Sequence, residues 1–257
     1  MLLCIDIGNT NIVFGVYDGD RLGARWRMAT DHQKMPDEYG LQTLGFMQRA
    51  GLVPADITGA CLASVVPPVT DLILEMLAEF VGQRPLVVGA GVRTGVAVRY
   101  DAPRDVGADR IVNAAAAYRL YGGPACIVDL GTATTFDALS EQGDYLGGAI
   151  APGIRLGAEA LFAHTAKLPR IDLHRPPKAI GSNTVDAMRS GILFGYVGLV
   201  EGMVARFRQE LGPEMRVIAT GGLADLIAAE TPVIEHVEPW LTLKGLRIIY
   251  QLNEVQT

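Results

Sequence analysis

Apolar residues follow two different periods along the amino-terminal part of the chain. Three runs rich in apolar and β-branched residues predict strands at about Met1–Ile7, Asn11–Asp18 and Arg21–Met28, and the Asp-Gly-Asp sequence at 18–20 predicts a turn between the last two. A helix is expected from about Pro36 to Ala50, and residues 60–66 predict another strand. The chain therefore opens with a meander of three strands, and helices then alternate with strands.

A second helix is predicted by apolar residues that recur at i, i+3 and i+4 spacing before Gly82, namely Val69, Leu72, Ile73, Met76, Leu77 and Phe80. Residues 85–89 then predict a strand and residues 96–100 an extended segment. A helix is expected from about Ala108 to Leu120, and the glycines at 122 and 123 end it. This order of elements is typical of an α/β protein.

The pattern of the first three strands restarts between Cys126 and Ile150. An apolar run again ends in Asp-x-Gly, small polar residues follow, and two further runs are separated by a Gly/Asp turn. Asp6-Ile7-Gly8 thus has a counterpart in Asp129-Leu130-Gly131, 129 − 6 = 123 residues later. We interpret this as the internal duplication of a domain-sized unit, because the hairpin and the third strand recur together with the turn. The remaining predicted elements are a helix at about Asn183–Leu211, a strand at 215–222, a helix at about Leu223–Ala229 and a final helix after Pro239.

The two Asp-x-Gly tips combine groups that suit a phosphate ligand. A turn rich in Gly, Thr and Asn directs backbone N–H groups and side-chain donors into one concavity. A carboxylate repels phosphate, but it can hold Mg²⁺ or the waters around it, and the metal then contacts phosphate oxygens. For one tip alone, a structural Asx-turn is the better explanation. Two tips favour a nucleotide held at its phosphates, and Thr220–Gly222 would let a ligand pass close to the backbone.

Charge and cysteine usage exclude several classes of protein. The chain has 22 basic and 28 acidic residues, a net charge of −6 and no basic block, so nucleic acid is not expected as a partner. The cysteines at 4, 61 and 126 lie far apart in apolar runs, which predicts buried thiols in a reducing cytoplasm. No uncharged apolar stretch approaches the roughly 20 residues of a membrane span. No charged leader precedes the first strand, so neither membrane insertion nor secretion is expected.

Other known devices for binding phosphate or metal are missing from the sequence. It contains no GxxxxGK[ST], no GxSxG and no HExxH. Gly89-x-Gly91 begins like a dinucleotide fingerprint, but Thr94 and an extended segment follow where a glycine and a helix should stand, which predicts a tight loop. Metal-ligand spacing is also lacking among the four histidines, His32, His164, His174 and His236.

The sequence Gly107-Ala108-Asp109-Arg110 places a carboxylate beside a guanidinium at the start of a predicted helix. Asp109 would be able to accept a hydroxyl proton, and Arg110 to bind the polar groups of a small anionic alcohol. The alternative is structural, because an acidic residue in the first turn stabilises a helix by about 0.3–1 kcal/mol. From the residues alone, the structural alternative is favoured.

Four motifs stand in the order of a known family: DIGNTN at 6–11, YDAPRDVGADRIVNAAAAY at 100–118, DLGTATTFD at 129–137 and NTVDAMRSGILFGY at 183–196. Along nearly its whole length the chain resembles type III pantothenate kinases, which belong to the actin, sugar kinase and Hsp70-like ATPase superfamily. The resemblance implies an α/β fold of two duplicated RNase H-like domains with a nucleotide cleft between them. These would be residues 1–113, with a helix at about 240–257 packed back on them, and residues 114–239. The implied activity is ATP-dependent phosphorylation of pantothenate to 4′-phosphopantothenate, the first step of coenzyme A biosynthesis, in the cytoplasm.

The resemblance also implies roles for individual residues. Asp109 would be the catalytic base, Asp6 would hold Mg²⁺ through water, and Asp129 would bind a monovalent cation, K⁺ or NH₄⁺. Thr184 would reach the acceptor from a neighbouring subunit, so a homodimer is expected. The implied acceptor-binding residues are Tyr100, Gly107, Ala108, Asp109, Arg110 and Thr184. The residues expected to contact ATP are Asp6, Ile7, Gly8, Asn9, Thr10, Asn11, Ile12, Val13, Thr132, Gly221 and Gly222.

Two alternatives to this function stay open. The chain would act on a different acceptor if it were another phosphotransferase or a polyphosphatase of the same superfamily. It would be non-catalytic if it resembled the relative named as an accessory factor in transcription, although the acidic charge and the intact Asp6, Asp109 and Asp129 argue against this. A row of small residues on the long helix, explained equally well by packing within one subunit and by a dimer, consists of Gly191, Gly195, Gly198 and Gly202.

Overall fold

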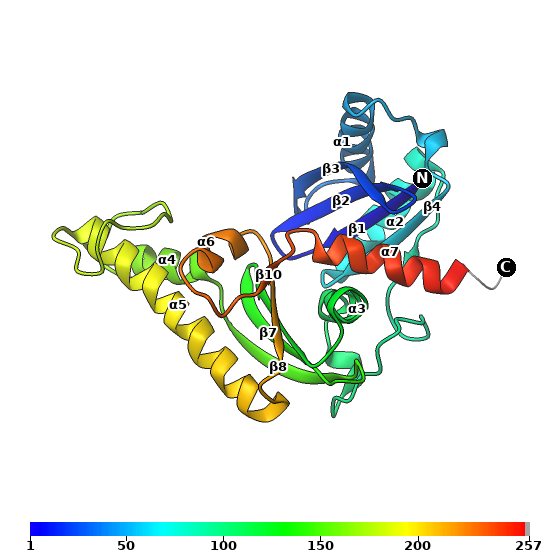
Figure 1. Ribbon diagram of the computed structural model, residues 1–257. Coiled ribbons are helices and arrows are strands. Elements are labelled where there is room, and N and C mark those ends of the chain that lie inside the picture. Colours follow the sequence, from blue (N-terminus) through cyan, green and yellow to red (C-terminus); the bar gives the residue numbers. More distant parts are fainter. Residues whose placement is uncertain (255–257) are drawn as a thin grey trace. The chain divides into compact units, whose positions relative to one another are not determined.

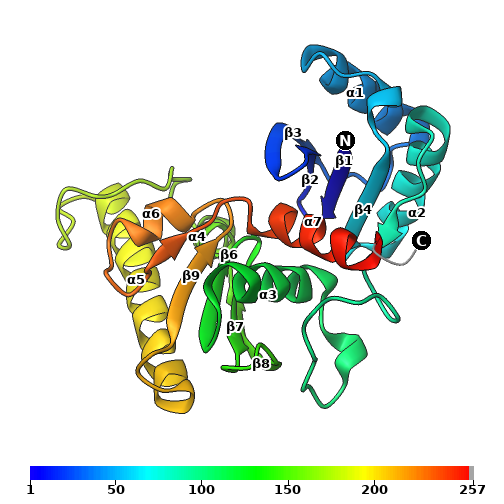
Figure 2. The same cartoon turned by 45° about the vertical axis from the view of Figure 1, so that its right-hand side comes forward.

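The chain forms two compact units in the computed structural model, which describes residues 1–254 (Figures 1 and 2). The first unit consists of Met1–Ala97, Asp101–Ala116 and the chain from Thr242 onward. The second consists of Val98–Tyr100 and Ala117–Leu241. The backbone therefore passes from one unit to the other at 97/98, 100/101, 116/117 and 241/242, and segments distant in the sequence build each unit.

The first unit contains a mixed five-stranded sheet. Its strands are β1 (Leu2–Ile7), β2 (Asn11–Asp18), β3 (Arg21–Ala29), β4 (Gly59–Ser64) and β5 (Leu86–Val87). Their order is β3-β2-β1-β4-β5, in which β2 is antiparallel to β1 and β3, and β4 is parallel to β1 and β5. The predicted meander is confirmed, and the central strand β1 contributes Leu3, Ile5 and Ile7 to the core.

The second unit repeats this sheet strand by strand. Its strands are β6 (Ala125–Leu130), β7 (Ala133–Leu139), β8 (Tyr145–Pro152), β9 (Arg216–Thr220) and β10 (His236–Val237). Across the sheet they run β8-β7-β6-β9-β10, with the antiparallel and parallel pairs at the same places as in the first unit. The predicted α/β class and internal duplication are therefore confirmed. Of these five strands only β10 was not predicted, because charged residues stand on both sides of His236–Val237 and no apolar run marks it.

Four helices complete the first unit: α1 (Pro36–Arg49), α2 (Pro67–Met76), the first turns of α3 (Ala108–Tyr121) and α7 (Leu241–Glu254). A π-helical turn continues the predicted second helix after α2, up to Gly82. The C-terminal helix α7 packs on the sheet, where Leu243 meets Gly15 and Tyr250 meets Gly59. It also crosses α3 closely, because Gly245 leaves room for the backbone of Val112. The expected C-terminal helix is confirmed as far as Glu254, and residues 255–257 lie outside the described chain.

The second unit carries α4 (Ile154–Ala163), α5 (Thr184–Leu211) and α6 (Ala224–Ala228). The long helix α5, yellow in Figure 1, was predicted, whereas α4 was not. Within residues 1–254, α5 is long and apolar enough to cross a membrane by length and composition alone, which is weak support because core helices meet the same criterion. Its contribution to the core of the unit consists of Ile192, Leu193, Val197, Val200 and Val204.

The three cysteines are buried free thiols, as the sequence predicted. Burial raises the pKa of each of these thiols, that of Cys61 to about 12. Because the thiolate is the reactive form, all three side chains are packing residues and not nucleophiles.

Candidate functional site

The first Asp-x-Gly tip is the tight turn between β1 and β2. Asp6 is half-buried near the end of β1, and the turn residues 9–11 are exposed. The Gly8 N–H donates to the Asn11 carbonyl over 3.0 Å, and Thr30 Oγ1 donates to the Gly8 carbonyl over 2.6 Å. The N–H of Gly8 is therefore used inside the turn and is not among the N–H groups of the tip that can face a ligand.

The amino terminus of α3 holds Asp109 in the same unit. The Arg110 N–H donates to Asp109 Oδ1 over 2.8 Å. A Cβ at Gly107 would lie 2.5 Å from this oxygen and 3.3 Å from Val65 Cγ1. The missing side chain at position 107 thus allows the carboxylate to lie close to the backbone, beside Val65.

Val65 connects this helix terminus to the first tip. It follows β4, and its N–H donates to the Ile7 carbonyl over 3.1 Å. Ile7 directly follows Asp6, and in the parallel pair of β1 with β4 it lies opposite Ser64. Asp6 and Asp109 are therefore found at the same end of the first sheet, at the carboxyl ends of the parallel strands β1 and β4. Ligands of open α/β sheets bind at these carboxyl ends.

Asp109 has a raised pKa. Burial raises the pKa of its carboxyl group above the ordinary Asp value, while the N–H bond and the positive charge of Arg110 oppose the shift. An acidic residue that served only to stabilise the helix terminus would have its pKa lowered by the positive end of the helix. A carboxylate whose charged form is disfavoured accepts a proton more readily, and such shifts gather at catalytic positions. The direction of this shift is compatible with a general base.

The second Asp-x-Gly tip joins β6 to β7 in the other unit. Its Gly131 N–H donates to the Ala133 carbonyl over 3.1 Å, so this group too is used inside the turn. Asp129 lies opposite Thr135 in the ladder, as Asp6 lies opposite Val13 in the first hairpin. Residues 8–11 connect the last ladder pair of the first hairpin, and residues 131–133 connect that of the second. The two hairpins therefore have the same pairing pattern, and the second connection is one residue shorter.

Helix α4 begins at the second tip, and the sequence analysis missed it. Gly153 precedes the helix, and the absence of a Cβ there makes room for the carbonyl oxygens of Gly131 and Thr132. A helix amino terminus presents N–H groups and partial positive charge, which favours phosphate. The adjacent Pro152-Gly153 sequence predicts a turn, so only the three-dimensional contact indicates that Gly153 supports the tip.

Gly221 packs directly against Asp129. The φ angle of Gly221 is +92°, and a Cβ there would lie 2.7 Å from both Asp129 Oδ1 and the Leu130 carbonyl oxygen. Strand β9 is parallel to β6 and brings Thr220 opposite Asp129. A carboxylate and a carbonyl oxygen thus come together beside the 220–222 segment. Hard cations prefer such oxygen ligands, so the donor set fits a monovalent cation.

The residues around Asp6 also fit a divalent cation that arrives with its ligand. Within residues 1–254, no three His, Cys, Asp or Glu side chains form a cluster that would hold a metal by themselves. Mg²⁺ usually keeps several waters and binds one or two carboxylates together with phosphate oxygens. A single half-buried carboxylate at the carboxyl end of β1 is sufficient for that arrangement.

The two remaining acceptor candidates lie on different elements of the second unit. Tyr100 is exposed, and the centroid of its ring lies 6.4 Å from that of Tyr145 on β8. Thr184 is exposed in the first turn of α5, where Asn183 Oδ1 caps the helix by accepting the Asp186 N–H over 2.9 Å. The structure therefore joins Asp6 with Asp109 in one unit and Asp129 with Gly221 in the other, whereas Tyr100 and Thr184 stand in different segments of the chain.

The sequence profile of the type III pantothenate kinases matches residues 2–206. A type III pantothenate kinase from Moorella thermoacetica is 55% identical over 253 residues, which cover 98% of this chain and 100% of the relative. The chain belongs to the type III pantothenate kinase family. The resemblance inferred from the four motifs is thereby confirmed.

Solved structures share the fold of this type III pantothenate kinase family member. A Campylobacter jejuni protein described as a Baf family transcriptional activator aligns with a TM-score of 0.63 at 19% identity and covers 98% of both chains. A Sinorhizobium meliloti protein described as a 2-dehydro-3-deoxygalactonokinase aligns with a TM-score of 0.63 at 12% identity and covers 100% of this chain and 98% of its own. At these identities the likeness concerns the fold alone.

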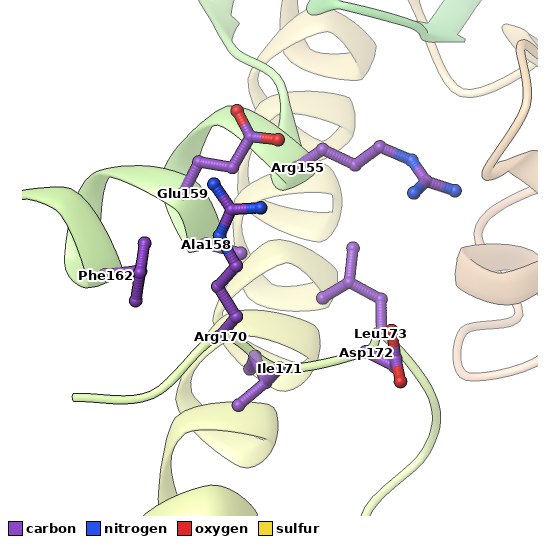
Figure 3. A pocket seen from close by; sticks show the side chains of 8 residues that line it. All are labelled: Arg155, Ala158, Glu159, Phe162, Arg170, Ile171, Asp172 and Leu173. Carbon is purple, nitrogen blue, oxygen red and sulfur yellow. The ribbon is translucent and has the colours of Figure 1, made fainter.

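A pocket of about 380 Å³ lies elsewhere in the second unit of this family member (Figure 3). It is bounded by α4 and by residues 170–173, and the Arg170 guanidinium lies 4.8 Å from the centroid of the Phe162 ring. None of the predicted site residues lines it, so it is separate from the residues discussed above. Its lining consists of Arg155, Ala158, Glu159, Phe162, Arg170, Ile171, Asp172 and Leu173.

Proposed function

We propose that this protein transfers the γ-phosphoryl group of ATP to the primary hydroxyl of pantothenate, with Asp109 as the base. Membership of the type III pantothenate kinase family supports the reaction. The assignment of roles rests on one observation, the position of Asp6 and Asp109 at the same end of the first sheet. Asp109 takes the hydroxyl proton as the new O–P bond forms, and ADP leaves with the electron pair of the broken bond. The product is 4′-phosphopantothenate, the first intermediate of coenzyme A biosynthesis.

The two tips supply the contacts to ATP in this proposal. Mg²⁺, held by Asp6 through water, would neutralise charge on the phosphates. Gly8 has no side chain, so the phosphates would be able to approach its backbone closely, although its own N–H is bonded to the Asn11 carbonyl. The amino terminus of α4 adds partial positive charge near Thr132. The proposed ATP contacts are Asp6, Ile7, Gly8, Asn9, Thr10, Asn11, Ile12, Val13, Thr132, Gly221 and Gly222.

Some of the proposed acceptor residues bind the polar groups of pantothenate, and others leave space for it. Arg110, beside the base, binds the carboxylate or the other polar groups of the substrate, and the backbone at Gly107 and Ala108 allows it to approach. Tyr100 is the further proposed contact to this substrate. Thr184 of a second copy of the chain completes the set.

We expect removal of K⁺ and NH₄⁺ to raise the KM for ATP, because Asp129 and the Leu130 carbonyl would then face the phosphates without a cation. The expected increase is on the order of tenfold, which corresponds to about 1.4 kcal/mol. Initial rates measured in K⁺, NH₄⁺ and a bulky organic cation at equal ionic strength test this. Rates that are the same in all three salts contradict the role of Asp129.

We propose a homodimer in which α5 takes part. Among the described residues, no atom of another segment lies within 4 Å of a Cβ built at Gly191, Gly195 or Gly198, so packing inside this chain does not explain the row of small residues. Light scattering should give twice the chain mass of 27.5 kDa. Gly195→Leu should lower that mass, whereas Gly45→Leu, at a helical glycine of α1 that also has no neighbour within 4 Å, should not. A monomeric wild-type protein contradicts the proposal.

The domain limits and the compartment complete the proposal. We take residues 1–113 with the helix from about 240, and residues 114–239, as the two duplicated domains of a cytoplasmic enzyme. An assay of ADP release over a panel of small alcohols separates the proposed reaction from its alternatives. Pantothenate should exceed every other acceptor in kcat/KM. An equal or better rate with another alcohol would favour a different phosphotransferase, and no turnover with Mg²⁺ and K⁺ present would favour a non-catalytic role.

A further inference from the structure

A fully buried carboxylate lies in the second sheet, outside the residues assigned above. Asp137 stands on β7 and is 0% exposed. Its Oδ1 accepts the Tyr145 hydroxyl over 2.8 Å, and its Oδ2 accepts the Thr135 hydroxyl over 3.1 Å. Burial of a charged group is costly unless hydrogen bonds satisfy it. A carboxylate that binds one hydroxyl with each oxygen fixes both of those side chains at once.

The Tyr145 hydrogen bond leads to the acceptor residue Tyr100. Tyr145 is also 0% exposed, and its ring lies 6.4 Å from that of Tyr100, at an interplanar angle of 57°. The Tyr145 carbonyl accepts the Arg99 N–H over 2.8 Å, and Val98 forms a parallel bridge with the same residue. Tyr145 therefore holds both the backbone and the ring of the short segment 98–100.

Gly147 completes the support of Tyr100 from the same strand. Its φ angle is +119°, and a Cβ there would lie 3.2 Å from Tyr100 Cε2. The ladder of β7 with β8 is irregular between the Ala138–Gly147 pair and the Leu139–Tyr145 pair. This irregularity allows Tyr145 to bind Asp137 while Gly147 leaves space for the Tyr100 ring. Tyr100 thus rests on two residues whose positions depend on the strand that carries Asp137.

The Thr135 hydrogen bond leads to the proposed cation ligand. Thr135 lies directly opposite Asp129 in the antiparallel ladder of β6 with β7, and directly opposite residues have their side chains on the same face of a sheet. Thr135 and Asp137 are two positions apart on one strand, so they share that face as well. Asp137 consequently stands between the Asp129 region and the Tyr100 region of a single sheet.

We infer that Asp137 is a positioning residue that orients Tyr100 through Tyr145 for the acceptor and Thr135 beside Asp129 for the cation. This inference rests on the proposed function, since it requires that Tyr100 contacts pantothenate and that Asp129 binds a monovalent cation. Because Asp137 is fully buried, we expect it to contact neither ligand directly. One oxygen is expected to affect the KM for pantothenate and the other the K⁺ concentration that gives half-maximal rate. Because these two quantities can be measured separately, the inference is testable.

Three variants of the full-length chain separate the two hydrogen bonds. Tyr145→Phe keeps the ring and removes the hydroxyl, so it should raise the KM for pantothenate about tenfold and change the KM for ATP less than about twofold. Thr135→Val should instead raise the K⁺ concentration for half-maximal rate about tenfold, with the KM for pantothenate unchanged. Asp137→Asn, in which only one oxygen remains as an acceptor, should shift both constants.

The controls exclude a merely structural role. Tyr118→Phe removes a hydroxyl from a ring of α3 that packs against Gly143 in the β7–β8 turn. This variant should change neither the KM for pantothenate nor the K⁺ concentration for half-maximal rate. Thermal melting shows which variants fold, and Tyr145→Phe and Thr135→Val decide the question if Asp137→Asn does not. Equal changes of both constants in each single variant, or a fall in kcat alone, overturn the inference. Failure of the wild-type chain to phosphorylate pantothenate overturns the proposed function instead.

Discussion

Replacing Asp109 with Asn is expected to lower kcat for pantothenate phosphorylation by about 100- to 10,000-fold, the usual contribution of a general base. Asn keeps the shape of the side chain and can still accept the Arg110 N–H, but it cannot take the hydroxyl proton. The KM for ATP should change by less than about twofold, because the loss concerns the transition state and not nucleotide binding. Steady-state rates of ADP release with each substrate varied in turn provide the measurement.

The pH dependence of the same variant is a second measurement of its role. Because burial raises the pKa of Asp109, the wild-type rate should fall on the acid side at a pH above the ordinary Asp value of about 3.9. The Asn variant should lack this acid limb. An acid limb that persists unchanged in the variant would assign it to another group.

Stability should change in the opposite direction to activity. A carboxyl group with a raised pKa in the folded state binds more protons there than in the unfolded state, so it favours folding at low pH, and this contribution is lost as the pH rises through its folded pKa. At neutral pH the Asn variant should therefore melt at a higher temperature than the wild-type chain. The difference should vanish below the ordinary Asp pKa. A variant that melts lower and loses ATP affinity would show that Asp109 supports the fold.

Replacing Gly221 with Ala is expected to destabilise the protein by about 2–4 kcal/mol, from overpacking and a left-handed backbone angle together. The new methyl group would lie 2.6 Å from the Leu130 carbonyl carbon and 2.7 Å from Asp129 Oδ1, so either the backbone or the carboxylate must move. Displacement of Asp129 should also raise the KM for ATP. Chemical unfolding with urea gives the stability, and initial rates give the KM.

Gly222→Ala is a matched control for the stability measurement. It adds the same methyl group one residue later, where no atom lies within 4 Å and φ is not positive. Its free energy of unfolding should stay within about 0.5 kcal/mol of the wild-type value. If both variants lose stability equally, the close approach of Gly221 to Asp129 is not the cause.

Much of the fold could be predicted because its signals are local. The two Asp-x-Gly tips, the strands on either side of them and the long α5 each have a period or a turn sequence that can be read within one segment. The absence of a helix after Gly89-x-Gly91 could be predicted in the same way, and residues 89–97 do form a loop. The duplication was visible because two such local patterns recur in the same order.

The parts that escaped prediction depend on contacts between distant segments. Helix α4 follows Pro152-Gly153 and contains Gly157, which lowers its helix propensity, and its packing against α5 stabilises it in spite of this. Tyr145 and Asp137 face each other only because the β7–β8 ladder is irregular. The role of Gly221 depends on a strand pair between segments more than 80 residues apart, since position 129 precedes 221 by 221 − 129 = 92 residues.

The position of α7 has a consequence for synthesis of the chain on the ribosome. The first sheet receives Leu243 and Tyr250 from a segment that is translated after the whole second unit. A nascent chain that ends at residue 116 has every strand of that sheet but leaves the apolar surface under α7 open to water. Completion of the first half must therefore wait until the second half has emerged, and during that interval the exposed strands are available to chaperones and to aggregation.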